Sequence, residues 1–126
     1  MDCMSVLAEA SLSDAEHRVL ERLGSALEAE FGSRLRSVWL YGSRARGEEP
    51  HPESDVDLLV VLDRSSMDDD HRVYDIVWSA AEKVGVSPVL FSTLVYDVDR
   101  IAQRREIRSF FIQEVDRDKI VLFGEP

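Results

Sequence analysis

The spacing of apolar residues predicts a long amphipathic helix near the start of this chain. Apolar side chains recur at helical intervals, and Ser13 followed by Glu16 has the spacing of a capping box. A glycine, Gly32, follows the last of these apolar positions: Val19, Leu20, Leu23, Leu27 and Phe31. We therefore expect a helix that begins after Ser13 and ends at Gly32.

Two apolar runs then predict strands, one on each side of a polar segment. Residues 35–41 are rich in valine, tryptophan, leucine and tyrosine and end at Gly42, which is typical of a strand that enters a tight turn. A short helix is expected at residues 43–46, and the two prolines within residues 48–54 predict a loop. Residues 56–62 are continuously apolar, which favours a strand at the centre of its sheet.

The second half of the chain predicts two further helices and two strands. Asp68, Asp69 and Asp70 precede a helical pattern that ends at Gly85, and such a triplet favours a helix N-terminus over a metal site. A third strand is expected at residues 87–96 and a short closing strand at 120–123. The last helix is marked by an apolar seam that includes Ile107, Phe110, Phe111 and Val115, with Glu114 among them.

This order of elements predicts one α/β (α+β) domain: a small mixed β-sheet flanked by helices, over residues 1–126 with a core at about 13–124. A hydrophobic fraction of 44% is sufficient for one modest core. Neither an internal repeat nor a linker interrupts the pattern.

Charge and cysteine content narrow the classes of partner and compartment. The formal net charge of −10 argues against a nucleic-acid binder and against anionic membranes. The only cysteine is Cys3, no apolar run reaches the length of a membrane span, and the N-terminus is acidic, so we expect a cytoplasmic protein. Two groups of arginines are compatible with an anionic ligand or an acidic partner, although a solvated, salt-bridged surface is the favoured interpretation of the second group. The first group is Arg34, Arg36, Arg44 and Arg46, and the second is Arg100, Arg104, Arg105 and Arg108.

Asp55 and Asp57 are the strongest candidates for chemistry. Side chains alternate along a strand, so these two carboxylates point to the same face about 7 Å apart. Like charges at that separation need a proton or a cation between them, and a hard divalent ion such as Mg²⁺ is the usual solution. Because Mg²⁺ commonly completes its coordination with substrate phosphates, the pair indicates a nucleoside triphosphate site.

The turn before this pair offers groups that suit a triphosphate. Gly42 lets the backbone approach closely, Ser43 supplies a hydroxyl, and the amides that follow form an anion-binding nest. An Asp-x-Asp at a strand start is more often a solvated edge, and a Gly-Ser turn is commoner still. The two together, twelve residues apart from Ser43 to Asp55, are far more selective.

These residues resemble a known family. The run from Gly42 to Gly47, GSRARG, followed by SDVDL at residues 54–58, is similar to the signature of minimal nucleotidyltransferases of the DNA polymerase beta superfamily. The likeness extends over most of the chain, from the preceding helix to the final IVLFG at residues 120–124.

The resemblance implies a nucleotidyltransferase fold in which Gly42 and Ser43 hold the β and γ phosphates while Asp55 and Asp57 hold Mg²⁺. The reaction it implies is transfer of a nucleoside monophosphate, AMP from ATP, to an acceptor hydroxyl. Arg44 and Arg46 would screen the phosphates or face a partner. For Arg46, a structural tie to neighbouring carboxylates is an equal alternative.

The chain departs from the family pattern at a third acidic residue, which catalytic members carry on a later strand. The strand expected at residues 87–96 has no acid before its end, and Ser87 or Val89 is expected to take that place. Asp97 and Asp99 come too late and favour a helix cap, and Glu53 lies in the loop. The metal that activates the acceptor would thus lose a ligand.

Three functional hypotheses remain open. The first is an adenylyltransferase-like enzyme that modifies a small helical HEPN-type partner protein as the antitoxin of a toxin–antitoxin pair, which the resemblance alone suggests. The second is a catalytically weak or inactive module that neutralises a partner by binding it. The third is a small-molecule-modifying enzyme, which would need a homo-oligomer to build its acceptor cleft. The sequence leaves the oligomeric state undecided.

Overall fold

The computed structural model describes residues 10–49 and 55–126. Four strands form one sheet with the order β3-β2-β1-β4. The elements along the chain are α2 (Asp14–Phe31), η1 (Gly32–Arg34), β1 (Leu35–Tyr41), α3 (Gly42–Ala45), β2 (Val56–Leu62), α4 (Met67–Val84), η2 (Pro88–Leu90), β3 (Phe91–Asp97), α5 (Val98–Glu106), α6 (Phe110–Asp118) and β4 (Ile120–Gly124).

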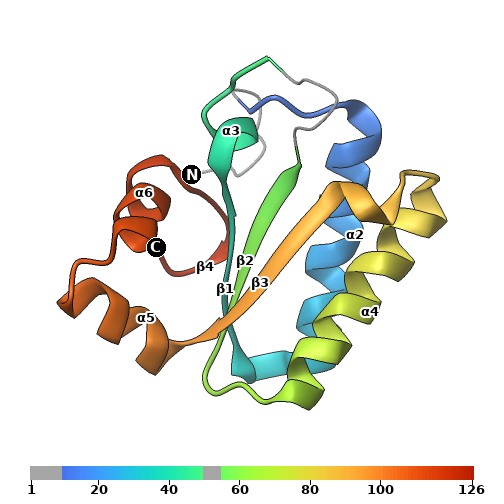
Figure 1. Cartoon of the computed structure of the whole chain (residues 1–126). Helices are drawn as coiled ribbons and strands as arrows, with labels where there is room; N and C mark the ends of the chain where they lie inside the picture. The colour runs from blue at the N-terminus through green and yellow to red at the C-terminus, as the bar shows by residue number, and fades with distance from the viewer. Residues whose placement is uncertain (1–9, 50–54) are drawn as a thin grey trace.

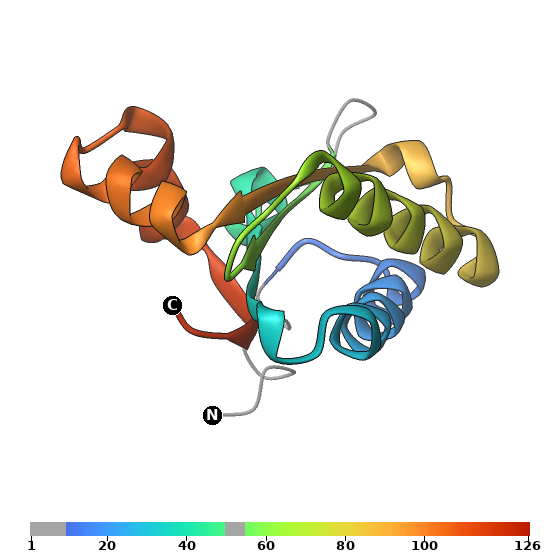
Figure 2. The ribbon, with the colours of Figure 1, turned by 90° about the horizontal axis from the view of Figure 1, so that it is seen from below.

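The sheet is mixed and has helices on both faces, as the sequence predicts. β1 runs antiparallel to β2 and to β4, whereas β2 and β3 are parallel. Figure 1 shows α2 and α4 together on one side of the sheet and α5 and α6 on the other, and Figure 2 shows the same two layers from below. The expected fold class is confirmed.

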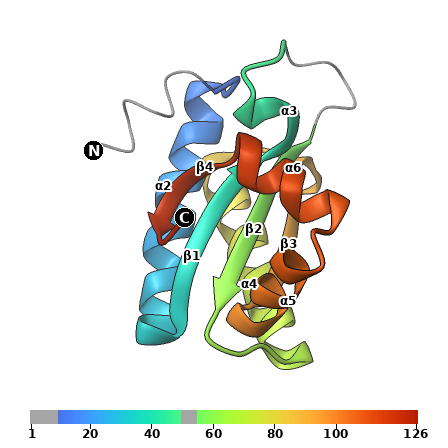
Figure 3. The same ribbon diagram turned by 90° about the vertical axis from the view of Figure 1, so that its left-hand side faces the viewer.

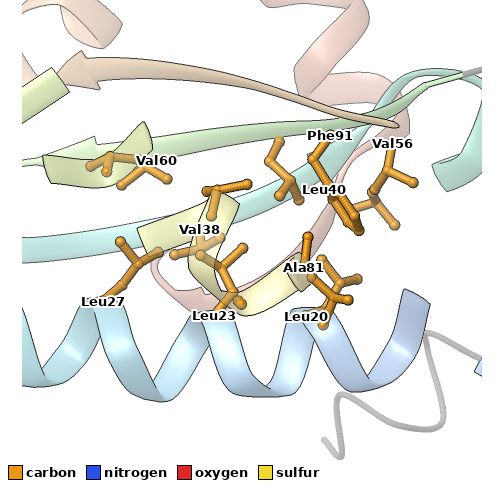
Figure 4. Close-up of a cluster of buried hydrophobic side chains, with 14 of the residues drawn as sticks. Leu20, Leu23, Leu27, Val38, Leu40, Val56, Val60, Ala81 and Phe91 are labelled. Atoms are coloured by element: carbon orange, nitrogen blue, oxygen red, sulfur yellow. The ribbon is translucent and has the colours of Figure 1, made fainter. Parts of the chain in front are cut away.

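Each face of the sheet has its own apolar cluster because residues alternate along the strands. Val38, Leu40 and Val56 pack against Leu20 and Leu23 of α2 on one face, together with residues of α4 (Figure 4). On the opposite face, Trp39, Leu59 and Val61 pack with Ile101, Ile112 and Val115. β2 is therefore covered on both sides, and its predicted central place is confirmed.

The predicted helix boundaries hold at the first two long helices. Ser13 and Glu16 form the expected capping box at the start of α2. α4 ends at Gly85, whose φ of 93° is the left-handed conformation that a glycine adopts without strain. Asp68, Asp69 and Asp70 lie in the first turn of α4, where the helix dipole favours negative charge.

Two predictions about the second half of the chain are wrong. The third strand begins at Phe91 and not at residue 87, because Pro88 starts a short 3-10 turn. The last helix is two helices, separated where Arg108 adopts a φ of 53° and Ser109 caps α6. Ile107 and Phe110 are 58% and 79% exposed, so the expected seam does not continue through them.

None of the described helices is both long enough and apolar enough to cross a bilayer.

Candidate functional site

The candidate residues meet at one end of the sheet, where β1 ends and β2 begins. Figures 1 and 3 show α3 at this end, beside the start of β2 and the segment that leads into α2. Tyr41, the last residue of β1, pairs directly with Asp57 on β2. The antiparallel register thus carries the Gly42 turn to the aspartate pair.

Gly42 and Asp57 are so close that only glycine fits. A Cβ atom built on Gly42 would overlap the Oδ2 atom of Asp57. Gly42 also has a φ of +78°, which residues with a side chain rarely adopt. The turn backbone and the Asp57 carboxylate therefore share one small volume, as a site for phosphate and cation together requires.

The negative charge of Asp55 acts on Asp57. Asp57 is half-buried, and Asp55 is exposed just before the first residue of β2. Burial, followed by the negative charge of Asp55, raises the pKa of Asp57, and the positive charges of Arg46 and Arg44 only partly oppose this. A bound divalent cation would relieve the repulsion between the two acids.

Asp57 lies on the face of the sheet that α5 and α6 cover, because it alternates with Leu59 and Val61. Its neighbour Tyr41 packs edge-on against Phe111 of α6, with ring centroids 5.5 Å apart. Burial and the charge of Asp57 raise the pKa of Tyr41 to about 12, so its hydroxyl stays protonated at neutral pH. Asp57 therefore has an aromatic residue, Tyr41, as its neighbour on β1.

The side chain of Arg44 points into the protein. Its side chain is buried, and its Nη1 donates to Glu16 Oε1 at 2.9 Å and to the carbonyl of Ser11 at 2.8 Å. This geometry favours a role in holding the turn, and nucleotide binding by Arg44 stays a prediction. Sequence reasoning identified Glu16 as a helix cap but missed its bond to Arg44, since no local pattern links residues 28 positions apart.

Arg46 is more exposed and is bound to two carboxylates. It donates to Glu48 at 2.8 Å and to Asp118 of α6 at 3.3 Å. The structural tie foreseen for Arg46 is therefore present. Its charge also opposes the rise in the pKa of Asp57, so a phosphate role for Arg46 stays a prediction with an electrostatic basis.

By the strand register, Ser92 is the residue of β3 where the resemblance would place a third acidic residue beside Asp57. Ser92 pairs with Asp57 across the parallel β2–β3 ladder, and laterally paired residues point to the same face. The expectation of Ser87 or Val89 is wrong, because both precede the strand. The register of β3 against β2 would have identified Ser92, but the sequence-based prediction began this strand at the wrong residue.

No acidic substitute appears in the parts of the chain that the structure describes. Asp97 accepts a hydrogen bond from the Arg100 backbone as the N-cap of α5, which confirms the capping interpretation, and Asp99 lies in the first helical turn. Over residues 10–49 and 55–126, no group of three or more His, Cys, Asp or Glu side chains could hold a metal. Glu53 lies outside the described residues.

In the second arginine group, the expected surface salt bridge is present at Arg105, and Arg100 lies against an aromatic ring. Arg105 forms an ion pair with Asp116 at 2.9 Å, and the guanidinium of Arg100 lies over the ring of Tyr96. Arg100 and Tyr96 also border a hollow of about 420 Å³ between β3 and α4. The described lining of that hollow includes neither aspartate of the candidate site.

Comparisons with known proteins identify the family of this chain. The family model described as "Nucleotidyltransferase domain" matches residues 20–119. Two variants of the toxin–antitoxin MntA-HpeT are among the similar solved structures. The first has 18% sequence identity and a TM-score of 0.49, and the match covers 83% of this chain and 72% of that chain. The second has 14% identity and a TM-score of 0.48, and the match covers 80% of this chain and 70% of that chain. A Sulfolobus solfataricus protein described as a nucleotidyltransferase shares 20% identity, with a TM-score of 0.41 over 90% of both chains. No curated protein matched the sequence.

Proposed function

Since the chain belongs to the nucleotidyltransferase domain family, we propose that it transfers a nucleoside monophosphate, AMP from ATP, to an acceptor hydroxyl. In this reaction the acceptor oxygen forms a bond to the α-phosphorus, pyrophosphate leaves, and the acceptor proton passes to solvent. One observation carries the proposal: the backbone of Gly42 lies directly against the Asp57 carboxylate, which joins a phosphate-binding turn to a cation-binding pair.

The proposed triphosphate position is at the turn. A glycine backbone without a side chain gives the phosphates close access to the amides of Gly42 and Ser43, and the Ser43 hydroxyl adds a donor. Arg46 is near enough to influence the charge of Asp57 and would attract the negatively charged phosphates in the same way. Tyr41, which pairs with Asp57, packs against Phe111 of α6.

The aspartate pair fits Mg²⁺ in its chemistry and its electrostatics. Carboxylate oxygens are the ligands that Mg²⁺ prefers, and one or two of them suffice when phosphates complete the coordination. Burial and the negative charge of Asp55 raise the pKa of Asp57, and a bound cation would favour its ionised form. Mg²⁺ held by Asp55 and Asp57 would offset the charge of the triphosphate and of the leaving pyrophosphate.

The acceptor proposed here is a hydroxyl on a partner protein, in the manner of the antitoxin of a toxin–antitoxin pair with a HEPN-type partner. This part of the proposal rests on the likeness of the GSRARG and SDVDL motifs to minimal nucleotidyltransferases. The net charge of −10 would favour a basic partner surface.

A second candidate is a nucleotide-binding module with little turnover. Ser92 at the place of the third carboxylate favours it, because the hydroxyl is a weaker cation ligand than a carboxylate. The nucleotide-side cation could still be held by Asp55, Asp57 and phosphates. Binding would then survive where transfer is slow.

Calorimetry of ATP with and without Mg²⁺ tests the proposal. We expect Mg²⁺-dependent binding by the wild type, its loss in Asp57→Asn, and its retention in the control Asp63→Asn, which alters an aspartate just beyond the other end of β2. Absence of Mg²⁺-dependent binding by the wild type would overturn the proposal. Labelled ATP then separates the two candidates: transfer to a partner favours the enzyme, and binding without transfer favours the module.

A further inference from the structure

We infer that Glu16, on the first turn of α2, is a positioning residue for the phosphate-binding turn and acts through a buried ion pair with Arg44. The inference deepens the proposed function, on which its nucleotide readout rests. Its structural readout, the order of the turn, is independent of any nucleotide.

The ion pair lies in the protein interior. The side chains of Arg44 and Glu16 are 6% and 9% exposed, and their charged atoms are 2.9 Å apart. Arg44 is held by its backbone as well, because its carbonyl accepts a hydrogen bond from Ser11 N–H at 2.9 Å. The Arg44 side chain also donates a hydrogen bond to the Ser11 carbonyl at 2.8 Å. Both the backbone and the side chain of Arg44 therefore bind the segment that precedes α2.

One oxygen of Glu16 serves two purposes. Glu16 Oε1 accepts from the backbone N–H of Ser13 at 2.8 Å, which completes the capping box, and it also accepts from Arg44. Burial raises the pKa of Glu16, but the hydrogen bonds from Ser13 and Arg44 outweigh it and lower the pKa overall. The carboxylate is therefore ionised at neutral pH and compensates the buried guanidinium.

This arrangement fixes the position of Gly42. Arg44 is two residues beyond Gly42, within the same four-residue helix α3. Because the Gly42 backbone already touches the Asp57 carboxylate, α3 has no free space in that direction. Movement of Arg44 would therefore change the placement of the Gly42 and Ser43 amides relative to Asp57. Glu16 itself makes no contact with the aspartate pair in the described structure, and its effect passes through Arg44.

The same contacts allow a purely structural explanation, in which Glu16 only caps α2. Three variants separate the two. Ser13→Ala removes the hydroxyl that caps Glu16 N–H at 3.1 Å but leaves the ion pair. Glu16→Gln keeps the size of the side chain and removes its charge. Arg44→Lys keeps the opposite charge but offers fewer donors.

Amide hydrogen exchange is measured first, without nucleotide. The probes are the N–H groups of Arg46 and Gly47, which donate to the carbonyls of Gly42 and Arg44 at 3.2 Å. We expect exchange at both amides to rise about tenfold in Glu16→Gln and less in Arg44→Lys. Ser13→Ala should accelerate exchange only in the first turn of α2.

Binding of MgATP is then measured on the same variants. We expect about tenfold weaker binding in Glu16→Gln and unchanged binding in Ser13→Ala, at temperatures equally far below each midpoint of unfolding. In the double variant Glu16→Gln/Arg44→Lys, amide exchange at Gly47 should be no faster than in the more affected single variant, since both changes disrupt the same ion pair.

Unchanged exchange at Arg46 and Gly47 in both Glu16→Gln and Arg44→Lys would overturn the inference, even if α2 were destabilised. If Glu16→Gln does not fold, amide exchange at Arg46 and Gly47 in Arg44→Lys tests the inference instead. A wild type that does not bind MgATP would refute the proposed function, while the exchange result would still decide whether Glu16 orders the turn.

Discussion

Two pairs of aspartates lie at opposite ends of the same strand, and their surroundings differ. Beyond the end of β2, Arg34 donates to Asp63 at 3.2 Å and to Asp69 at 2.7 Å. At the beginning of β2, neither Asp55 nor Asp57 forms an ion pair with any described residue, although Arg44 and Arg46 influence Asp57 from a distance. Arg34 neutralises one pair, whereas the other has no ion-pair partner among residues 10–49 and 55–126 and is the pair that we propose binds a cation.

The pKa directions follow this difference. Burial opposes ionisation of Asp63, but hydrogen bonds from Arg64 and Arg34 lower its pKa, and the bond from Arg34 lowers that of Asp69. The pKa of Asp57 is raised. Paired acids therefore add stability at neutral pH, whereas the ionised Asp57 reduces it. Ionised Asp57 therefore destabilises the fold, as groups at functional sites often do.

The largest effect is expected from Gly42→Ala. The added Cβ would overlap Asp57 Oδ2 at a φ of +78°, so we expect a loss of about 2–4 kcal/mol in the free energy of unfolding and no measurable binding of MgATP. Chemical denaturation and calorimetry provide the two measurements. Gly85→Ala is the matched control, because its φ is +93° and no atom lies within 4 Å of the added Cβ. A loss in Gly42→Ala no larger than in the control would show that the contact with Asp57 is unimportant.

Asp69→Asn should destabilise the fold, because it disrupts the ion pair with Arg34 near the end of β2. Its carboxylate accepts two hydrogen bonds from Arg34, so we expect a loss of about 1–3 kcal/mol in the free energy of unfolding at pH 7 and unchanged MgATP binding. The folded-state pKa of Asp69 is lowered, so this contribution is present above its unfolded pKa of about 3.9 and disappears as the pH falls through the folded value. Denaturation curves of wild type and variant should converge in acid. Curves that stay separated would contradict the assignment.

Ser92→Asp adds a third acidic residue beside Asp57 and should increase the difference between the two aspartate pairs. Without metal, we expect a loss of about 1 kcal/mol in the free energy of unfolding from the added repulsion. With Mn²⁺ or Mg²⁺, we expect about tenfold tighter cation binding and faster transfer, measured by calorimetry and labelled ATP. Thr93→Asp is the control, because its side chain points to the other face of β3. Equal cation affinity in wild type and Ser92→Asp would refute the placement of the third-acid position.

Asp57→Asn should have the smallest effect on stability, and an effect of opposite sign. Because the folded-state pKa of Asp57 is raised, ionisation costs stability as the pH rises through the unfolded and folded pKa values. We expect the variant to gain about 0.5–1 kcal/mol in the metal-free state at pH 7, with no gain below pH 3, while Mg²⁺-dependent nucleotide binding is lost. A variant less stable than the wild type without metal would place Asp57 among the structural acids.

Local patterns predicted most of the fold. The bounds of β1 and β2 follow from continuous apolar runs, and both ends of α2 and the C-terminus of α4 follow from capping residues. The division between α5 and α6 was missed because Arg108 is an unusual residue for a positive φ, so no glycine or proline marks the break. The start of β3 was missed because Pro88 fits a strand edge as well as the 3-10 turn that it begins.

The site could be predicted only as far as its spacing in sequence. Alternation along a strand placed Asp55 and Asp57 together, and the Gly42 turn was recognisable from its composition. The roles of Arg44 and Arg34 depend on partners distant in sequence, Glu16 in one case and Asp63 and Asp69 in the other. Such partners follow from helix docking and sheet register, which no local pattern contains.

The most direct test of this account is the pKa of the Asp57 carboxyl, measured by nuclear magnetic resonance on the wild-type protein with and without Mg²⁺. The account predicts a metal-free pKa above the value of about 3.9 for an unperturbed aspartate, and a fall when Mg²⁺ binds. Asp69 should titrate below that value in both conditions. An Asp57 pKa at or below 3.9 that does not respond to Mg²⁺ would contradict the claim that this pair is left for a cation.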